Sequence, residues 1–101
     1  MGPLRRTQSN PQPIGNVFDQ LFRQLGLTRR LHQYDVVAQW KEIVGEQIAQ
    51  VSEATRVENG VLFVHVKSSA WRNELLLRKQ EILARIQLRF RGTGIHDIHF
   101  L

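Results

Sequence analysis

Hydrophobic residues recur with helical spacing near the start of the chain. The apolar side chains lie three and four residues apart, at Val17, Phe18, Leu21, Phe22 and Leu25. This spacing predicts a short amphipathic helix, with Asn16 as its N-cap, Asp19 in its first turn and Gly26 at its end.

A second helix is predicted from Thr28 or Arg29 to near Ser52. Its apolar face comprises Val37, Trp40, Ile43, Val44, Ile48 and Val51. Gly45 interrupts this pattern at a cost of about 1 kcal/mol relative to Ala. We interpret the glycine as a site where another backbone packs closely against the helix.

Alternating apolar and polar positions follow, which is typical of strands. Thr55 and Val57 precede Asn59-Gly60, and Leu62, Val64 and Val66 come after it. Asn and Gly tolerate the positive φ angles of a tight turn, so the two strands are predicted to form a hairpin. With Leu62, Val64 and Val66 inward, the outward face carries Val61, Phe63, His65 and Lys67.

A third, long helix is predicted from Ser68 or Ser69 towards Phe90, before the glycines at 92 and 94. Its inward stripe comprises Trp71, Leu75, Ile82 and Ile86. Residues 95–101 then predict a closing strand. The order α-α-β-β-α-β indicates an α+β domain in which a three-stranded sheet is packed on one face by helices, with Trp40 and Trp71 in the core.

Length and composition narrow the possible classes of protein. The chain has 101 residues, no cysteine and a formal net charge of +5, which excludes disulfides and thiolate metal sites. Residues 1–13 contain all three prolines and predict a disordered basic arm, with one domain over residues 14–101. No apolar run approaches the ~20 residues that span a bilayer, and no secretory signal is evident. We therefore expect a cytoplasmic protein without a membrane partner.

The positive charge is concentrated in two segments. Residues 1–30 carry +4, residues 31–66 carry −3, residues 67–91 carry +5 and the last ten carry −1. Clustered basic residues are typical of proteins that bind nucleic acid or another anionic surface. A solvated helix face explains the same pattern equally well.

Three segments follow one another along the predicted domain: Trp40-Lys-Glu-Ile-Val-Gly-Glu-Gln-Ile-Ala49, Glu58-Asn-Gly-Val-Leu-Phe-Val-His-Val66 and Ser68-Ser-Ala-Trp-Arg-Asn-Glu-Leu75. In this order they resemble the motifs of the DciA-like family, a bacterial family associated with the replicative DNA helicase. The resemblance implies a K-homology-like domain, affinity for single- or double-stranded DNA with weak sequence preference, and the hexameric replicative helicase as partner. It also implies association with the nucleoid and no cofactor. The Gly-x-x-Gly loop with which K-homology domains clamp RNA is absent from this sequence.

Basic residues in and around the third helix are the candidate nucleic-acid contacts. With the two arginines of the arm, the set is Lys67, Arg72, Arg78, Arg85, Arg89, Arg91, Arg5 and Arg6. Glu74 and Glu81 precede Arg78 and Arg85 by four residues, so intrahelical ion pairs are the alternative for those two arginines.

Apolar residues off the core stripe are the candidate partner contacts. Leu77, Ala84 and Leu88 form a second strip on the third helix, which either the first helix covers or a partner contacts. Phe63 faces outward beside basic residues, where it either stacks on a base or packs against a helix or partner.

The sequence favours a binding protein over an enzyme. The four histidines do not converge with carboxylates, so no metal site is predicted, and no nucleophile or nucleotide-binding motif is present. The leading hypothesis is a non-enzymatic DNA-replication accessory protein that binds the replicative helicase and DNA and assists helicase loading. An RNA-binding K-homology-like module and a protein–protein adaptor remain as alternatives.

Overall fold

A computed structural model describes residues 12–101, with side chains from residue 17 onward. Residues 1–11, most of the predicted arm, lie outside the described residues, and the domain boundary at residue 14 stays a prediction. The helices are α2 (Gln12–Gln24), α3 (Leu27–Ala38), α4 (Trp40–Val44), α5 (Glu46–Ala49), α6 (Ser69–Leu77) and α7 (Lys79–Arg89). The strands are β1 (Ser52–Glu58), β2 (Val61–Val66) and β3 (Asp97–Phe100).

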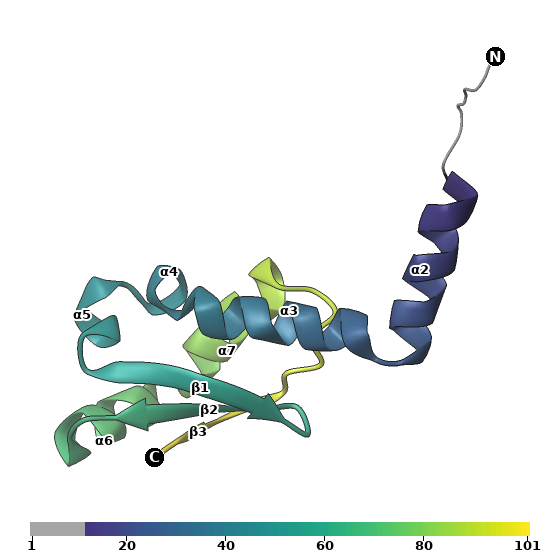
Figure 1. Ribbon diagram of the computed structural model, residues 1–101. Coiled ribbons are helices and arrows are strands. Elements are labelled where there is room, and N and C mark those ends of the chain that lie inside the picture. The colour runs from purple at the N-terminus through teal and green to yellow at the C-terminus, as the bar shows by residue number, and fades with distance from the viewer. Residues whose placement is uncertain (1–11) are drawn as a thin grey trace.

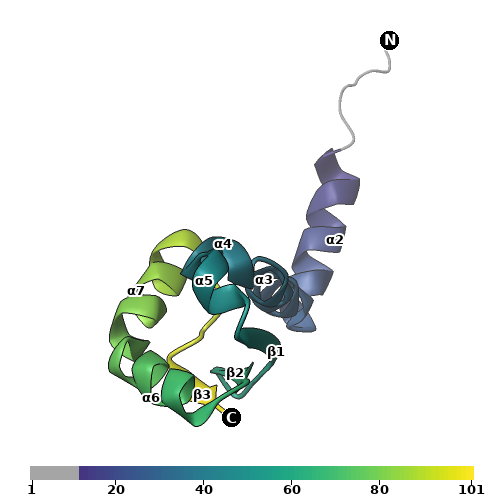
Figure 2. The same cartoon turned by 90° about the vertical axis from the view of Figure 1, so that its left-hand side faces the viewer.

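The fold is α+β, with one mixed sheet in the order β1-β2-β3. β1 and β2 are antiparallel, and β2 and β3 are parallel. Helices α3 to α7 form an arc over one face of this sheet, and the other face is open (Figure 2). The predicted helix-covered, three-stranded sheet is therefore correct.

The hairpin turn forms at the predicted dipeptide. Asn59 and Gly60 have φ angles of 53° and 77°, the left-handed values that a two-residue turn requires. Leu62, Val64 and Val66 are at most 1% exposed, and His65 and Lys67 are exposed. The alternation in the sequence thus predicted the two faces of β2 correctly.

The predicted second helix is wrong as a continuous element, because it is divided into α3, α4 and α5. Gly45 has φ 89° and ψ 164°, which ends α4 and begins α5. No atom lies within 4 Å of the position that a Cβ would occupy there. Gly45 is therefore needed for its backbone conformation, and the expected close backbone neighbour is absent. The chain leaves α5 before Ser52, which already belongs to β1.

The predicted third helix is also divided. Arg78, with φ −99° and ψ 6°, separates α6 from α7. Its backbone N–H donates to the carbonyls of both Glu74 and Leu75, so the last turn of α6 is tightened before the chain changes direction. Leu75, Ile82 and Ile86 are still buried, at 2% exposure or less, because each helix keeps its own apolar side towards the sheet.

Trp40 anchors the core near the break between α3 and α4. It is 4% exposed, and its indole Nε1–H donates a 3.0 Å hydrogen bond to the Ser52 hydroxyl. That hydroxyl donates in turn to the Ile48 carbonyl at 2.7 Å. The buried polar groups of three elements are thus satisfied together, and Trp40 is structural, as predicted. Trp71 is half-buried against the same core.

Helix α2 differs most from the sequence prediction. It begins at Gln12 rather than at an Asn16 cap, and it stands away from the rest of the domain, joined through Gly26 (Figure 1). Its apolar residues are exposed, with Val17 at 62% and Phe18 at 54%.

Candidate nucleic-acid and partner interface

The predicted basic residues lie around α6 and α7. Lys67 follows β2, Arg72 lies in α6, Arg78 joins the two helices, and Arg85 and Arg89 lie in α7. Arg91 follows α7 in an exposed turn. Arg5 and Arg6 lie outside the described residues.

Two of these arginines form the predicted intrahelical ion pairs. Arg78 Nε lies 2.7 Å from Glu74 Oε2, and Arg85 pairs with Glu81. The side chains of Arg78 and Arg85 remain 50% and 46% exposed. Each guanidinium is therefore partly neutralised but still accessible to solvent.

Arg85 and Arg89 also attach α7 to α4. Arg85 Nη1 donates to the main-chain carbonyl of Ile43 at 3.2 Å, and Arg89 Nη1 donates to that of Glu42 at 3.2 Å. These carbonyls belong to the C-terminal part of α4, where helix carbonyls lack intrahelical partners and cations are favoured. Part of the arginine row therefore has a structural role, and its contact with phosphate stays a prediction.

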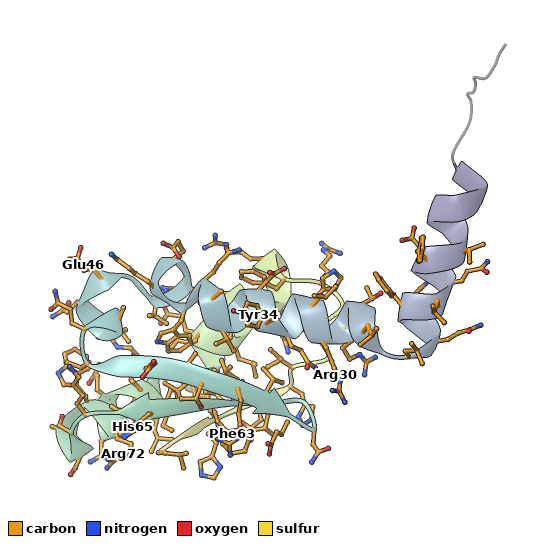
Figure 3. The ribbon with its side chains drawn as sticks, viewed as in Figure 1. Arg30, Tyr34, Glu46, Phe63, His65 and Arg72 are labelled. Atoms are coloured by element: carbon orange, nitrogen blue, oxygen red, sulfur yellow. The ribbon has the colours of Figure 1, made fainter. Side chains whose placement is uncertain are left out.

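Lys67, Arg72 and Arg91 take part in none of the ion pairs between described residues. Lys67 is exposed and lines a depression of about 500 Å³ together with His65 and Glu53. Arg72 is half-buried in the first turns of α6, whose N-cap Ser68 accepts a hydrogen bond from the Trp71 N–H at 3.2 Å. Figure 3 shows His65 and Arg72 at the same end of the domain.

The apolar strip on α6 and α7 is open to solvent. Leu77 is 84% exposed and Leu88 is 74% exposed, and Ala84 between them is exposed as well. The prediction that the first helix covers these residues is therefore wrong, because α2 extends away from α6 and α7 (Figure 1). The strip is available to a partner, and this role stays a prediction.

Phe63 lies on the open face of the sheet between side chains from both neighbouring strands. The Arg56 guanidinium lies 4.2 Å from the centre of the Phe63 ring. The His99 ring stacks on Phe63 with centroids 5.5 Å apart and planes 22° apart. Both neighbours are register partners of Phe63. The ring is thus occupied by protein groups, which disfavours it as a platform for a base.

A groove that the sequence interpretation missed lies between α3 and β1. It has a volume of about 900 Å³ and is lined in part by Arg29, Arg30 and Arg56. The available signal was the pair Arg29-Arg30 in the first turn of a predicted helix, but the sequence did not indicate that Arg56 would lie near them.

Among the described residues, no group of three or more His, Asp or Glu side chains could hold a metal ion. The pKa of Asp97 is lowered because the Lys79 ammonium donates a hydrogen bond to its carboxylate at 2.9 Å. This ion pair joins α7 to β3 and serves the fold.

The structure is that of a small α+β domain whose candidate contacts are charged and apolar residues at its surface. Between residues 12 and 101 no helix is long and apolar enough to cross a membrane. The chain belongs to the DciA family, because a family model described as "Dna[CI] antecedent, DciA" matches residues 13–100. The predicted family resemblance is therefore confirmed.

Relatives of known sequence agree with this assignment. A UPF0232 protein of Rhodococcus jostii is 34% identical over 86 residues, which cover 85% of this chain and 45% of the relative. A UPF0232 protein of Mycobacterium tuberculosis (strain H37Rv) is 35% identical over 77 residues, which cover 76% of this chain and 41% of the relative. The chain thus spans less than half the length of these relatives.

Proposed function

We propose that this domain is a non-enzymatic accessory protein of DNA replication that binds the replicative helicase and DNA and assists helicase loading. The observation that carries the proposal is membership of the DciA family over residues 13–100. The description of that family as a Dna[CI] antecedent associates it with the loading of the replicative helicase. The K-homology-like fold implied by the resemblance belongs to the same proposal.

The exposed apolar strip supports a protein partner. Leu77 and Leu88 are the two most exposed large hydrophobic side chains among the described residues. Exposed leucines on two consecutive helices, Leu77 on α6 and Leu88 on α7, are typical of protein–protein contacts. In the proposal, the helicase contacts Leu77, Ala84 and Leu88.

The basic residues near α6 support contact with DNA phosphates. Lys67 and Arg72 lie close in sequence to the N-terminus of α6, where backbone N–H groups favour anions. Neither residue is paired with a carboxylate among the described residues. Arg91 adds a third cation of this kind, whereas Arg78, Arg85 and Arg89 are engaged with glutamates or carbonyls and contribute less.

The experiment that tests the proposal is capture of the purified replicative helicase from the same organism by the immobilised protein. The capture is measured at low and high salt, with and without single-stranded DNA, and matched RNA is tested for binding in parallel. We expect retention of the helicase and a DNA affinity that falls steeply with salt. Failure to retain the helicase at low salt would overturn the proposal even if DNA were bound.

The adaptor alternative is favoured by one observation, the ion pairs that occupy Arg78 and Arg85. An adaptor would retain the helicase and show no salt-dependent binding to DNA. The same capture experiment therefore separates the two functions, because the DNA titration is read independently of helicase retention.

A further inference from the structure

A groove between α3 and β1 lies away from the residues proposed above. Its volume is about 900 Å³. Arg29, Arg30 and Tyr34 contribute to it from α3, and Arg56 and Asn59 contribute from β1 and the hairpin turn. Viewed from the end, α3 and β1 lie on the opposite side of the domain from α6 and α7 (Figure 2).

The groove carries a surplus of positive charge. Three arginines and one acidic residue, Glu58, line it, and the guanidinium of Arg56 itself lies over the Phe63 ring. Glu58 Oε2 lies 3.1 Å from Arg56 Nε, and the Arg56 side chain is still 50% exposed. Arg29 and Arg30 are exposed and take part in no ion pair between described residues. An anion in the groove would therefore find two cations without a competing carboxylate.

The position of Arg29 and Arg30 in α3 is locally unfavourable. Both lie in the first turn, which contains no acidic residue, and the N-cap Gly26 provides no side-chain cap. Cations at a helix N-terminus oppose the helix dipole and destabilise the helix. Residues that break a local rule in this way are expected at functional sites, and a bound anion would remove the conflict.

The other walls of the groove fit a nucleic-acid strand. Tyr34 is 69% exposed, so its ring is free to stack on a base beside the arginines. Figure 3 shows the Arg30 side chain below α3, on the side of the hairpin, and Tyr34 further along the same helix. Guanidinium groups bind phosphate through paired N–H donors, which suits a phosphodiester backbone.

An added peptide strand fits the groove less well. β1 is one of the two edge strands of the sheet, but its register shifts between Ala54 and Arg56. Bulges and charged side chains on an edge strand oppose the addition of another strand. Arg56 and Glu58 supply such charges here.

We propose that the groove between α3 and β1 binds the phosphodiester backbone of single-stranded DNA, with Arg29 and Arg30 at phosphates and Tyr34 stacked on a base. The choice of DNA as the source of the phosphates rests on the proposed function. The site itself rests on the groove, its charge and the exposed tyrosine. It gives the domain a DNA contact independent of Lys67 and Arg72.

The test is fluorescence anisotropy of a labelled oligothymidylate with the full chain and its Arg29→Gln/Arg30→Gln variant. We expect roughly a tenfold loss of affinity at low salt and a salt slope reduced by about 1.4, since each lost phosphate contact removes about 0.7 for single strands. A Tyr34→Ser variant is expected to lose about fivefold in affinity through lost stacking. Lys41→Glu is the matched control, because it changes the net charge by the same two units at an exposed position of α4, and it is expected to keep nearly full affinity.

Each outcome decides between the two proposals. If Arg29→Gln/Arg30→Gln binds the oligonucleotide as tightly as Lys41→Glu does, the groove does not bind DNA and this proposal is overturned. If a second double variant, Lys67→Gln/Arg72→Gln, is then the only one that loses DNA affinity, the proposed function remains intact. A double variant that keeps DNA affinity but no longer retains the helicase would show that the groove takes an acidic peptide instead. No DNA binding by the wild-type chain would overturn the DNA part of both proposals. The urea midpoint of Arg29→Gln/Arg30→Gln is expected to equal or exceed that of wild type. This measurement distinguishes a loss of DNA binding from a loss of folding.

Discussion

Arg85 Nη1 donates a hydrogen bond to the main-chain carbonyl of Ile43, 42 residues earlier in the chain, at 3.2 Å. The same guanidinium pairs with Glu81 one turn away on its own helix. Arg85 therefore connects α7 to the end of α4. The sequence indicated Arg85 as a phosphate contact, but its side chain also forms a hydrogen bond that links two helices.

Arg85→Ala is expected to lower the free energy of unfolding by about 1 kcal/mol, because it removes a charge-assisted hydrogen bond from a half-exposed site. Arg78→Ala removes only an exposed ion pair within one helix and is expected to cost less than about 0.5 kcal/mol. Urea denaturation of both variants measures the difference. Equal costs would contradict the connecting role of Arg85.

Gly45→Ala tests the break between α4 and α5. In the structure Gly45 has φ 89° and ψ 164°, a region essentially confined to glycine, so alanine is expected to destabilise the fold by about 1–3 kcal/mol. A continuous helix through residue 45 predicts the opposite sign, a gain of about 1 kcal/mol. The thermal or urea midpoint of this single variant therefore distinguishes the two backbones, and a stabilised variant would contradict the fold described here.

The ion pair between Lys79 and Asp97 predicts a specific dependence on pH. The Lys79 hydrogen bond and that of the Ile98 N–H lower the pKa of Asp97 below its ordinary value of 3.8. A group with a lowered folded-state pKa stabilises the fold above its unfolded-state pKa, and this contribution is lost as the pH falls through the folded-state pKa. The stability difference between wild type and Lys79→Met is therefore expected to be present at neutral pH and to shrink in acid. A difference that stays constant down to the acid transition would contradict this pairing.

Phe63 is expected to matter more for stability than for DNA binding. Its ring lies between Arg56 and His99, so Phe63→Leu removes packing and cation–π contacts worth about 1 kcal/mol in total. The affinity for single-stranded oligothymidylate is expected to stay within about twofold of wild type, because the ring is occupied by Arg56 and His99 and does not stack on a base. A stacked base would be worth at least about 1 kcal/mol, and its loss would lower the affinity about fivefold. Anisotropy titration gives the affinity. A fivefold loss with unchanged folding would restore Phe63 as a base platform.

Local patterns predicted much of this molecule. The alternation of Leu62, Val64 and Val66 gave the buried face of β2, and Asn59-Gly60 gave the turn. The spacing of Glu74 and Glu81 from Arg78 and Arg85 gave the two ion pairs. These features depend on neighbours within four residues or on strand periodicity, both of which are readable from sequence.

Features set by tertiary contact were missed. Arg78 separates α6 from α7 without glycine or proline, so no local signal marked the break. The stacking of His99 on Phe63 depends on the parallel register of β2 and β3, which the sequence does not contain. Arg56 joins Arg29 and Arg30 only because β1 packs beside α3. The spacing of the first apolar residues indicated a helix but not its position, and α2 stands away from the domain with these residues exposed.

In the proposed function, the domain binds the replicative helicase through Leu77 on α6 and Ala84 and Leu88 on α7. The most direct measurement is the affinity of the helicase for wild type and for Leu77→Glu/Leu88→Glu, with each protein immobilised and single-stranded DNA binding measured on the same samples. Both leucines are more than 70% exposed, so the charges should leave the fold intact. We predict that the variant loses at least about tenfold in helicase affinity, equivalent to 1.4 kcal/mol, and keeps at least half of its DNA affinity. Equal helicase affinity of the two proteins, or no helicase binding by wild type, would contradict the account.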